Sequence, residues 1–155
     1  MNRIIILLLV AITASTTAKA QEEQTTYKNA IGIRLGPSTP VIKSGISFKH
    51  FMNDSKAIEG IVSFGDGFAV CGLYEIHKPI TAAEDLQWFI GFGGYAGFSK
   101  TTTNIGGAGI VGLNYNFWGK NIPLNISLDW KPELNIVQKV GFEGSTVGFS
   151  ARYTF

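Results

Sequence analysis

The charged side chains of this chain are placed where they could pair with one another away from water. Eight of them lie at alternate positions within apolar segments, on the side opposite the large apolar residues. Four are basic and four are acidic: Arg34, Lys49, Lys131 and Arg152, and Glu59, Glu75, Asp129 and Glu133. Buried charges are tolerated only when they are paired and hydrogen-bonded. The equal numbers of basic and acidic residues predict that these side chains form a charge network in the lumen of a barrel. The alternative is that they are solvated charges on the surface of a soluble barrel.

Glu75 and His77 are the one pair whose spacing suggests acid–base or metal chemistry, because they share a face two residues apart. A zinc site normally needs three or four ligands, and the other histidine, His50, lies in a different segment. We therefore expect a structural hydrogen bond between Glu75 and His77. We expect no metal site.

A glycine-rich motif and a single cysteine also fail as functional sites. Gly91-Phe-Gly93-Gly-Tyr-Ala96 matches a dinucleotide-binding fingerprint, which requires a helix directly after it. Gly97, Phe98 and a Ser/Thr run follow instead, so no helix begins there. The only cysteine, Cys71, sits in an apolar strand pattern and is expected to be a small buried residue. The sequence predicts no catalytic residue, no cofactor and no enzymatic activity.

These residues are carried by eight segments in which large apolar residues alternate with polar or small ones. Such a period of two predicts β-strands, and the segment lengths of about 8–12 residues approach the 9–11 needed to span a membrane. The chain also contains 19 glycines and 11 phenylalanines, which disfavour helices. We predict an all-β, eight-stranded antiparallel up-and-down transmembrane barrel. The segments are 30–36, 42–51, 57–64, 68–77, 86–98, 108–117, 124–133 and 146–155.

Two features near the end of the chain give expectations of local structure. Pro132 cannot donate a hydrogen bond to a neighbouring strand, so we expect strand pairing to stop there. The connection over 135–145 is the longest one, and we expect it to be a mobile outer loop.

The first twenty residues have the composition of a cleavable signal peptide. A basic start at Arg3 precedes an apolar run over 4–14, and Ala18-Lys19-Ala20 supplies small residues for cleavage. We predict a signal peptide over 1–20, a short periplasmic segment over 21–28 and a barrel domain over 29–155. Removal of Arg3 and Lys19 would change the formal charge from +2 to neutral. Nucleic-acid binding is therefore not expected.

Whether the apolar or the polar face of the strands points outward determines whether the barrel lies in a membrane or in water. The polar side carries few charges and many Gly, Ser and Asn residues, which suits a crowded interior better than a water-facing surface. Aromatic residues gather near the expected strand ends, as in membrane barrels. They are Tyr74, Trp88, Tyr115, Phe117, Trp118, Tyr153 and Phe155 near one rim, and Phe64, Phe68, Phe98 and Trp130 near the other. Two alternatives stay open, which are a soluble lipocalin-like barrel that binds a small apolar ligand and a narrow-pore porin.

The last segment, Val147-Gly-Phe-Ser-Ala-Arg-Tyr-Thr-Phe155, resembles the C-terminal assembly signal of bacterial outer-membrane proteins. Together with the signal peptide and the eight segments, it resembles the small barrels of the OmpA/OmpX class. The stretch 123–132 is also similar to a segment of small barrels of this kind. The resemblance implies recognition of Phe149, Tyr153 and Phe155 by the barrel-assembly machinery. It also implies a Gram-negative outer membrane, lipid as a partner, and surface loops that bind an unspecified ligand.

Overall fold

The computed structural model describes residues 27–37, 41–65, 67–83, 85–117, 121–137 and 140–155. The signal peptide predicted over 1–20, most of the segment predicted over 21–28, and Trp118 lie outside these residues. The described residues form ten strands, and all of them belong to one sheet. The strands are β1 (Asn29–Leu35), β2 (Gly45–Asn53), β3 (Lys56–Phe64), β4 (Gly67–Pro79), β5 (Leu86–Ser99), β6 (Thr103–Asn116), β7 (Leu124–Trp130), β8 (Glu133–Asn135), β9 (Gly141–Glu143) and β10 (Val147–Thr154).

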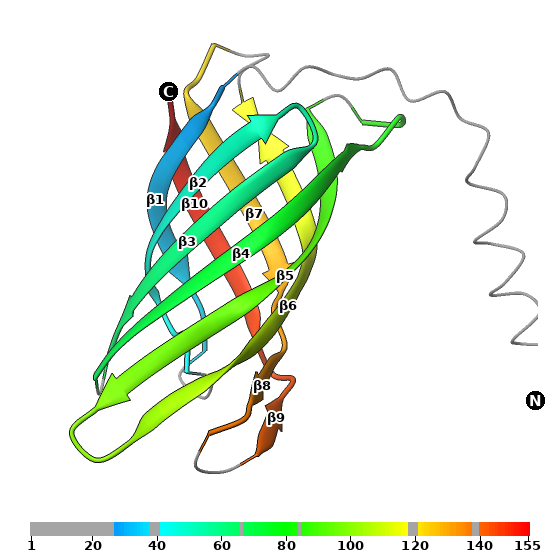
Figure 1. Ribbon diagram of the computed structural model, residues 1–155. Helices are drawn as coiled ribbons and strands as arrows, with labels where there is room; N and C mark the ends of the chain where they lie inside the picture. Colours follow the sequence, from blue (N-terminus) through cyan, green and yellow to red (C-terminus); the bar gives the residue numbers. More distant parts are fainter. Residues whose placement is uncertain (1–26, 38–40, 66, 84, 118–120, 138–139) are drawn as a thin grey trace, which may run out of the picture.

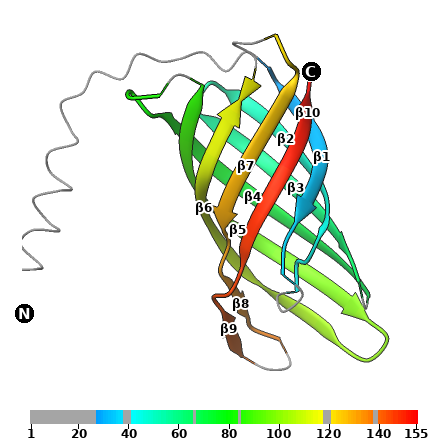
Figure 2. The same cartoon turned by 180° about the vertical axis from the view of Figure 1, so that it is seen from behind.

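Eight of these strands close into a barrel. Strands β1 to β7 follow one another around the wall, and β10 lies between β7 and β1. All of these pairings are antiparallel, and the ring is complete because β5 also pairs with β6. Figures 1 and 2 show the closed wall from opposite sides, with the start of β1 beside the C-terminus at one end. The predicted all-β, eight-stranded antiparallel barrel is confirmed.

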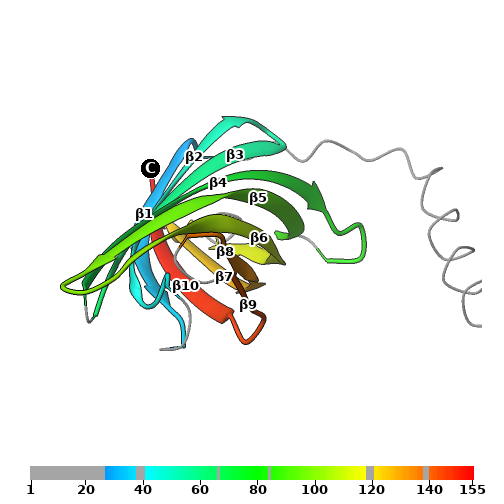
Figure 3. The ribbon, with the colours of Figure 1, turned by 60° about the horizontal axis from the view of Figure 1, so that its bottom comes forward.

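The alternation in the sequence separates two faces of the wall. Successive side chains of a strand point to opposite sides of a sheet, so one set must enter the interior. Figure 3 shows the strands curving around that interior. The large apolar residues of β1 and β7, such as Ile33 and Leu128, are exposed on the outside, whereas Arg34 and Asp129 are buried.

The wall is taller on one side than on the other. Strands β4, β5 and β6 contain 13, 14 and 14 residues, whereas β1, β7 and β10 contain only 7, 7 and 8. The β5–β6 hairpin therefore extends beyond the end of β7 at the rim opposite the termini (Figure 1). Strands β8 and β9 extend the wall at this same rim.

The prediction that pairing stops at Pro132 is wrong. Strand β6 pairs Val111 with Trp130 of β7, and then Ala108 with Glu133 of β8, without a change of register. Between these pairs, the amide of Gly109 donates a hydrogen bond of 3.0 Å to the carbonyl oxygen of Pro132. Proline lacks only the donor, so it removes one hydrogen bond and leaves its carbonyl free to keep the strand in place.

The expected outer loop over 135–145 is also partly strand. Residues Gly141–Glu143 form β9, which pairs with β8 in an antiparallel hairpin. Residues 138–139, between β8 and β9, lie outside the described residues.

Candidate functional site

The eight charged residues predicted to form a network all lie inside the barrel. Each is at most 3% exposed, and together they come from seven strands and from the link between β7 and β8. They do not form one continuous network but three groups, each containing equal numbers of basic and acidic side chains. The interior charge is therefore neutralised locally as well as in total.

The largest group, here called the central cluster, consists of Lys49, Glu59, Glu75 and Arg152. The ammonium of Lys49 lies 3.2 Å from Glu59 Oε2 and 2.7 Å from Glu75 Oε2, so it bridges the two carboxylates. Arg152 approaches the other oxygen of Glu59 at 2.5 Å. Ser47 joins them, because its hydroxyl donates to Glu59 at 2.5 Å and accepts from Arg152 Nε at 2.7 Å. Strands β2, β3, β4 and β10 are thus tied together across the interior.

Arg152 also links the central cluster to β7, the neighbour of its own strand β10. Its Nη1 donates to the Ser127 hydroxyl at 2.9 Å and to the Asn125 side-chain oxygen at 3.3 Å, both on β7. The guanidinium therefore uses its fork of donors to contact three strands at once.

A layer of amides closes the polar interior toward the termini. The Asn125 amide donates to the side-chain oxygens of Asn114 at 2.8 Å and Asn116 at 2.7 Å. Tyr27, which precedes β1, donates from its hydroxyl to Asn116 at 3.0 Å. Burial raises the pKa of the Tyr27 phenol above its ordinary value, and the protonated hydroxyl is the donor in this bond.

His77 is packed between aromatic rings beside the central cluster. Its Nε2 lies 2.8 Å from Glu75, which is the hydrogen bond predicted from their spacing. The imidazole stacks on Phe89 at 4.9 Å and an interplanar angle of 17°, and Phe51 covers it at 4.9 Å and 59°. Lys49 lies 4.6 Å above the Phe89 ring, at cation–π distance. Within the part of the chain that the structure describes, no three His, Cys, Asp or Glu side chains are grouped to hold a metal ion.

The second group is a single ion pair between opposite sides of β10. Arg34 on β1 binds Asp129 on β7 through two parallel contacts of 2.5 and 2.6 Å. The guanidinium passes over Gly148 of β10, where a Cβ would lie 2.2 Å from Nη2 of Arg34. Glycine at this position therefore leaves room for the guanidinium in this placement.

The third group fixes a segment that enters the barrel from the β1–β2 connection. Glu133 binds Lys131 and also accepts hydrogen bonds from the backbone amides of Val41 at 2.9 Å and Ile42 at 3.3 Å. Ile42 is only 2% exposed. The second strand was predicted to begin at residue 42, but β2 begins at Gly45 because Val41 and Ile42 turn into the interior instead of joining the wall.

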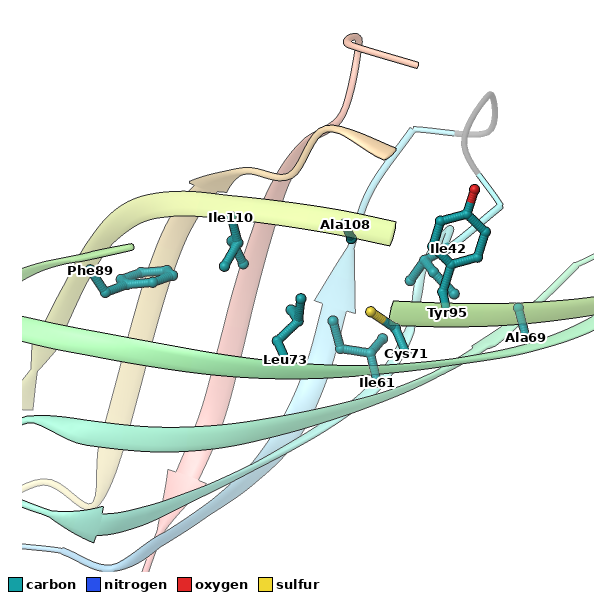
Figure 4. Close-up of a cluster of buried hydrophobic side chains, with 9 residues drawn as sticks. All are labelled: Ile42, Ile61, Ala69, Cys71, Leu73, Phe89, Tyr95, Ala108 and Ile110. Atoms are coloured by element: carbon teal, nitrogen blue, oxygen red, sulfur yellow. The ribbon is translucent and has the colours of Figure 1, made fainter. Parts of the chain in front are cut away.

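An apolar cluster occupies the interior next to this segment, toward the rim opposite the termini (Figure 4). Ile61 interrupts the alternation of apolar and polar residues over 57–64, and it is a member of the cluster. Cys71 is a free thiol buried here, as its apolar surroundings predicted. The cluster consists of Ile42, Ile61, Ala69, Cys71, Leu73, Phe89, Tyr95, Ala108 and Ile110.

The three residues of the proposed assembly signal lie on the outer surface. Phe149 and Tyr153 are exposed on β10, and Phe155 follows that strand directly and is also exposed. The rings of Tyr153 and Phe155 stack at 6.2 Å near the rim that holds the termini.

No family model, curated protein or solved structure matches the chain. Among the described residues, no helix has the length and hydropathy needed to cross a membrane. What the barrel can do follows from its own outer surface and interior.

The central cluster should be sensitive to the loss of one carboxylate. In Glu59→Gln, Lys49 and Arg152 would share only Glu75 and leave an uncompensated buried positive charge. Breaking a buried pair in this way costs about 3–5 kcal/mol in the free energy of unfolding, which urea denaturation followed by tryptophan fluorescence would measure. Glu143→Gln is the matched control, since Glu143 is only partly buried and binds a backbone amide. Equal effects of the two substitutions would contradict the role of the cluster.

The inward position of residues 41 and 42 should depend on Glu133. The double variant Lys131→Ala/Glu133→Ala keeps the interior neutral but removes both carboxylate acceptors, so the two amides should exchange with solvent at least about tenfold faster. Amide hydrogen exchange measured by NMR reads out each position separately. Ser63→Ala is the control, because it removes the acceptor of the Lys43 amide and the donor to the Ser44 carbonyl but leaves Glu133 in place. Unchanged protection at Val41 and Ile42 in the double variant would show that the segment is held by something else.

Proposed function

We propose that this chain is an integral outer-membrane β-barrel protein of a Gram-negative bacterium, similar to the small OmpA/OmpX class. Its barrel would be a rigid, side-chain-filled cylinder with a structural role or a role in binding ligands through its surface loops. The observation that carries the proposal is the inverted distribution of side chains, with apolar residues outside and paired charges inside.

The outer surface of the barrel is apolar on every side. Each of the eight barrel strands exposes large apolar side chains, including Ile33 of β1, Ile58 of β3 and Phe92 of β5. Monomeric soluble proteins rarely expose contiguous apolar patches larger than a few hundred Å². A closed barrel can meet lipid on this face because its backbone donors and acceptors are paired within the ring.

The height of the apolar surface fits a bilayer. On β5 the outward aromatic residues Trp88 and Phe98 are ten positions apart. At a rise of about 3.3 Å per residue and a tilt of about 40°, this separation corresponds to about 25 Å along the barrel axis. Outer-membrane barrels carry an apolar band of about that height between two aromatic girdles.

The interior argues against the two competing functions. A lipocalin-like carrier places apolar residues inside to hold its ligand, whereas Lys49, Glu59 and Arg152 occupy the middle of this barrel. A porin needs a water-filled path, but large charged side chains from β2, β3, β4 and β10 meet here in direct ion pairs. The proposal therefore includes no transport of solutes as its main activity.

The remaining parts of the proposal concern export, assembly and chemistry. The residues over 1–20 have the pattern of an export signal, and the outward Phe149, Tyr153 and Phe155 match the pattern read by the barrel-assembly machinery. The partners would be this machinery and outer-membrane lipid, and no nucleic acid. The proposal contains no catalytic step and no cofactor.

Membrane integration has a direct test in cell fractionation and gel mobility. The protein should cofractionate with the outer membrane, resist extraction by alkaline carbonate and need detergent to stay in solution. A closed barrel resists unfolding in SDS without heat, so boiled and unboiled samples should migrate differently on a gel. Recovery as a monodisperse, detergent-free protein would overturn the proposal.

A charge on the outer face should weaken insertion. Leu128 is exposed on β7 near the middle of the apolar surface. Leu128→Lys should lower the free energy of unfolding in phosphatidylcholine vesicles by about 2–4 kcal/mol, because a lysine at the bilayer midplane must leave water. Leu128→Ala is the control and should cost far less. If both variants fold equally well into vesicles, this face does not contact lipid.

A further inference from the structure

The β8–β9 hairpin continues the barrel wall beyond the end of β7. Strand β8 pairs with β6 in the same register as β7, so the two strands act as one wall element interrupted at Lys131 and Pro132. Figures 1 and 2 both show the hairpin at the rim farthest from the C-terminus.

A β-bulge changes the direction of the side chains in this hairpin. Lys131 is hydrogen-bonded to Thr146, and the next pair is Glu133 with Glu143, so the returning strand contains one extra residue. Two contacts hold this irregularity, from the Trp130 indole to the carbonyl of Gly144 at 2.6 Å and from the Ser145 amide to Glu143 at 2.8 Å. An extra residue in one strand re-aims the side chains beyond it.

The bulge makes the hairpin amphipathic. In β10 the odd-numbered residues face outward. Beyond the bulge the even-numbered Phe142 faces outward, because it pairs with the outward-facing Leu134. The outward face carries Leu134, Ile136, Val140 and Phe142, which are 46%, 59%, 75% and 69% exposed. The opposite face carries Glu133, Asn135, Gly141 and Glu143. If the same residues continued in regular alternation without the bulge, Glu143 would face outward in place of Phe142.

The outward face of the hairpin is continuous with the apolar outer surface of the barrel. From Leu124 to Ile136 every second residue is apolar and is partly or fully exposed. These twelve steps correspond to about 30 Å along the axis at a tilt of about 40°, slightly more than an apolar band of about 25 Å. Leu134 and Ile136 therefore reach the outer boundary of the proposed bilayer, and Phe142 is paired beside Leu134.

We propose that the outward face of the β8–β9 hairpin binds lipid at the boundary between acyl chains and headgroups of the outer leaflet. The hairpin then acts as a one-sided extension of the membrane-contacting wall, and the bulge at Gly144 and Ser145 is what turns Phe142 toward the lipid. This inference rests on the proposed membrane location. A second copy of the chain and bulk water are the alternative occupants of the same face.

Lipid contact can be measured one position at a time. The chain has a single cysteine, so Cys71→Ala provides a background for single-cysteine variants labelled with the fluorophore NBD. The labelled variants are Phe142→Cys on the outward face, Gly141→Cys on the opposite face of the same strand, and Leu128→Cys on the barrel. The protein is refolded into phosphatidylcholine vesicles with or without lipid that carries a nitroxide at carbon 5 of the acyl chain. Far-ultraviolet circular dichroism and gel mobility verify that each variant is folded.

We expect the quenching of fluorescence at position 142 to be at least half of that at 128, and at least about threefold greater than at 141. Quenching at 128 without quenching at 142 would overturn the inference and leave the proposed membrane location intact. Absence of quenching at 128 would instead overturn the membrane location. Equal quenching at 141 and 142 would contradict a defined lipid-facing side, and crosslinking between copies through position 142 would assign the face to a second copy.

Deletion of Ser145 tests the role of the bulge independently. Removal of the extra residue should restore regular alternation from Thr146 and keep Phe142 opposite Leu134 on the outward face, so quenching at 142 should be retained. Deletion of Gly144 and Ser145 together should instead turn Phe142 inward and lower the quenching at 142 to the level of 141 in the parent protein, while quenching at 128 should not change. Loss of quenching at 142 in the folded single deletion, or unaltered quenching in the folded double deletion, would show that the bulge does not direct this side chain.

Discussion

Asn29 and Phe155 exchange two backbone hydrogen bonds of 3.0 and 2.9 Å, and beyond them β1 pairs with β10 over six residue pairs. This contact between the two ends of the described barrel closes the sheet. A closed sheet has no edge, so its backbone groups are paired within the wall. Closure also separates the inner face from bulk solvent, and every side chain on that face must then find its partners inside the barrel.

The arrangement of the interior follows from that separation. Charges that could be solvated on an open sheet here have to be neutralised, and each of the three groups achieves this with direct ion pairs. Around the central cluster the hydroxyl of Ser47 and the amides near Asn125 supply further hydrogen bonds. Where the charged residues end, Ile42 and the apolar cluster fill the remaining space. The interior is thus built from a polar section, in which the eight buried charged side chains form ion pairs, and an apolar section that packs beside it.

The β8–β9 hairpin shows how a small change of register can extend a surface. One extra residue between Glu143 and Thr146 reverses the alternation, so that Phe142 joins the same face as Leu134. Bulges are common at the rims of barrels, where they redirect a side chain or end the pairing. Here the bulge adds apolar surface on one side of the rim, next to the tall wall of β4 to β6.

The sequence by itself determined the strands, their two faces and the balance of charges. These properties are local, because a period of two along the chain decides which residues share a face, whatever the partners of the strand are. The spacing of Glu75 and His77 likewise placed them on one face, and they are hydrogen-bonded in the structure.

Only the tertiary structure decided which residues meet. Arg34 pairs with Asp129 and Arg152 with Glu59, at sequence separations of 95 and 93 residues. Such partners depend on the register and closure of the barrel, which alternation does not encode. The inward turn of Val41 and Ile42, the continued pairing across Pro132 and the bulge before Thr146 were missed for the same physical reason. Each depends on a backbone hydrogen bond to a strand or side chain elsewhere in the fold, and the residue types alone do not specify that partner.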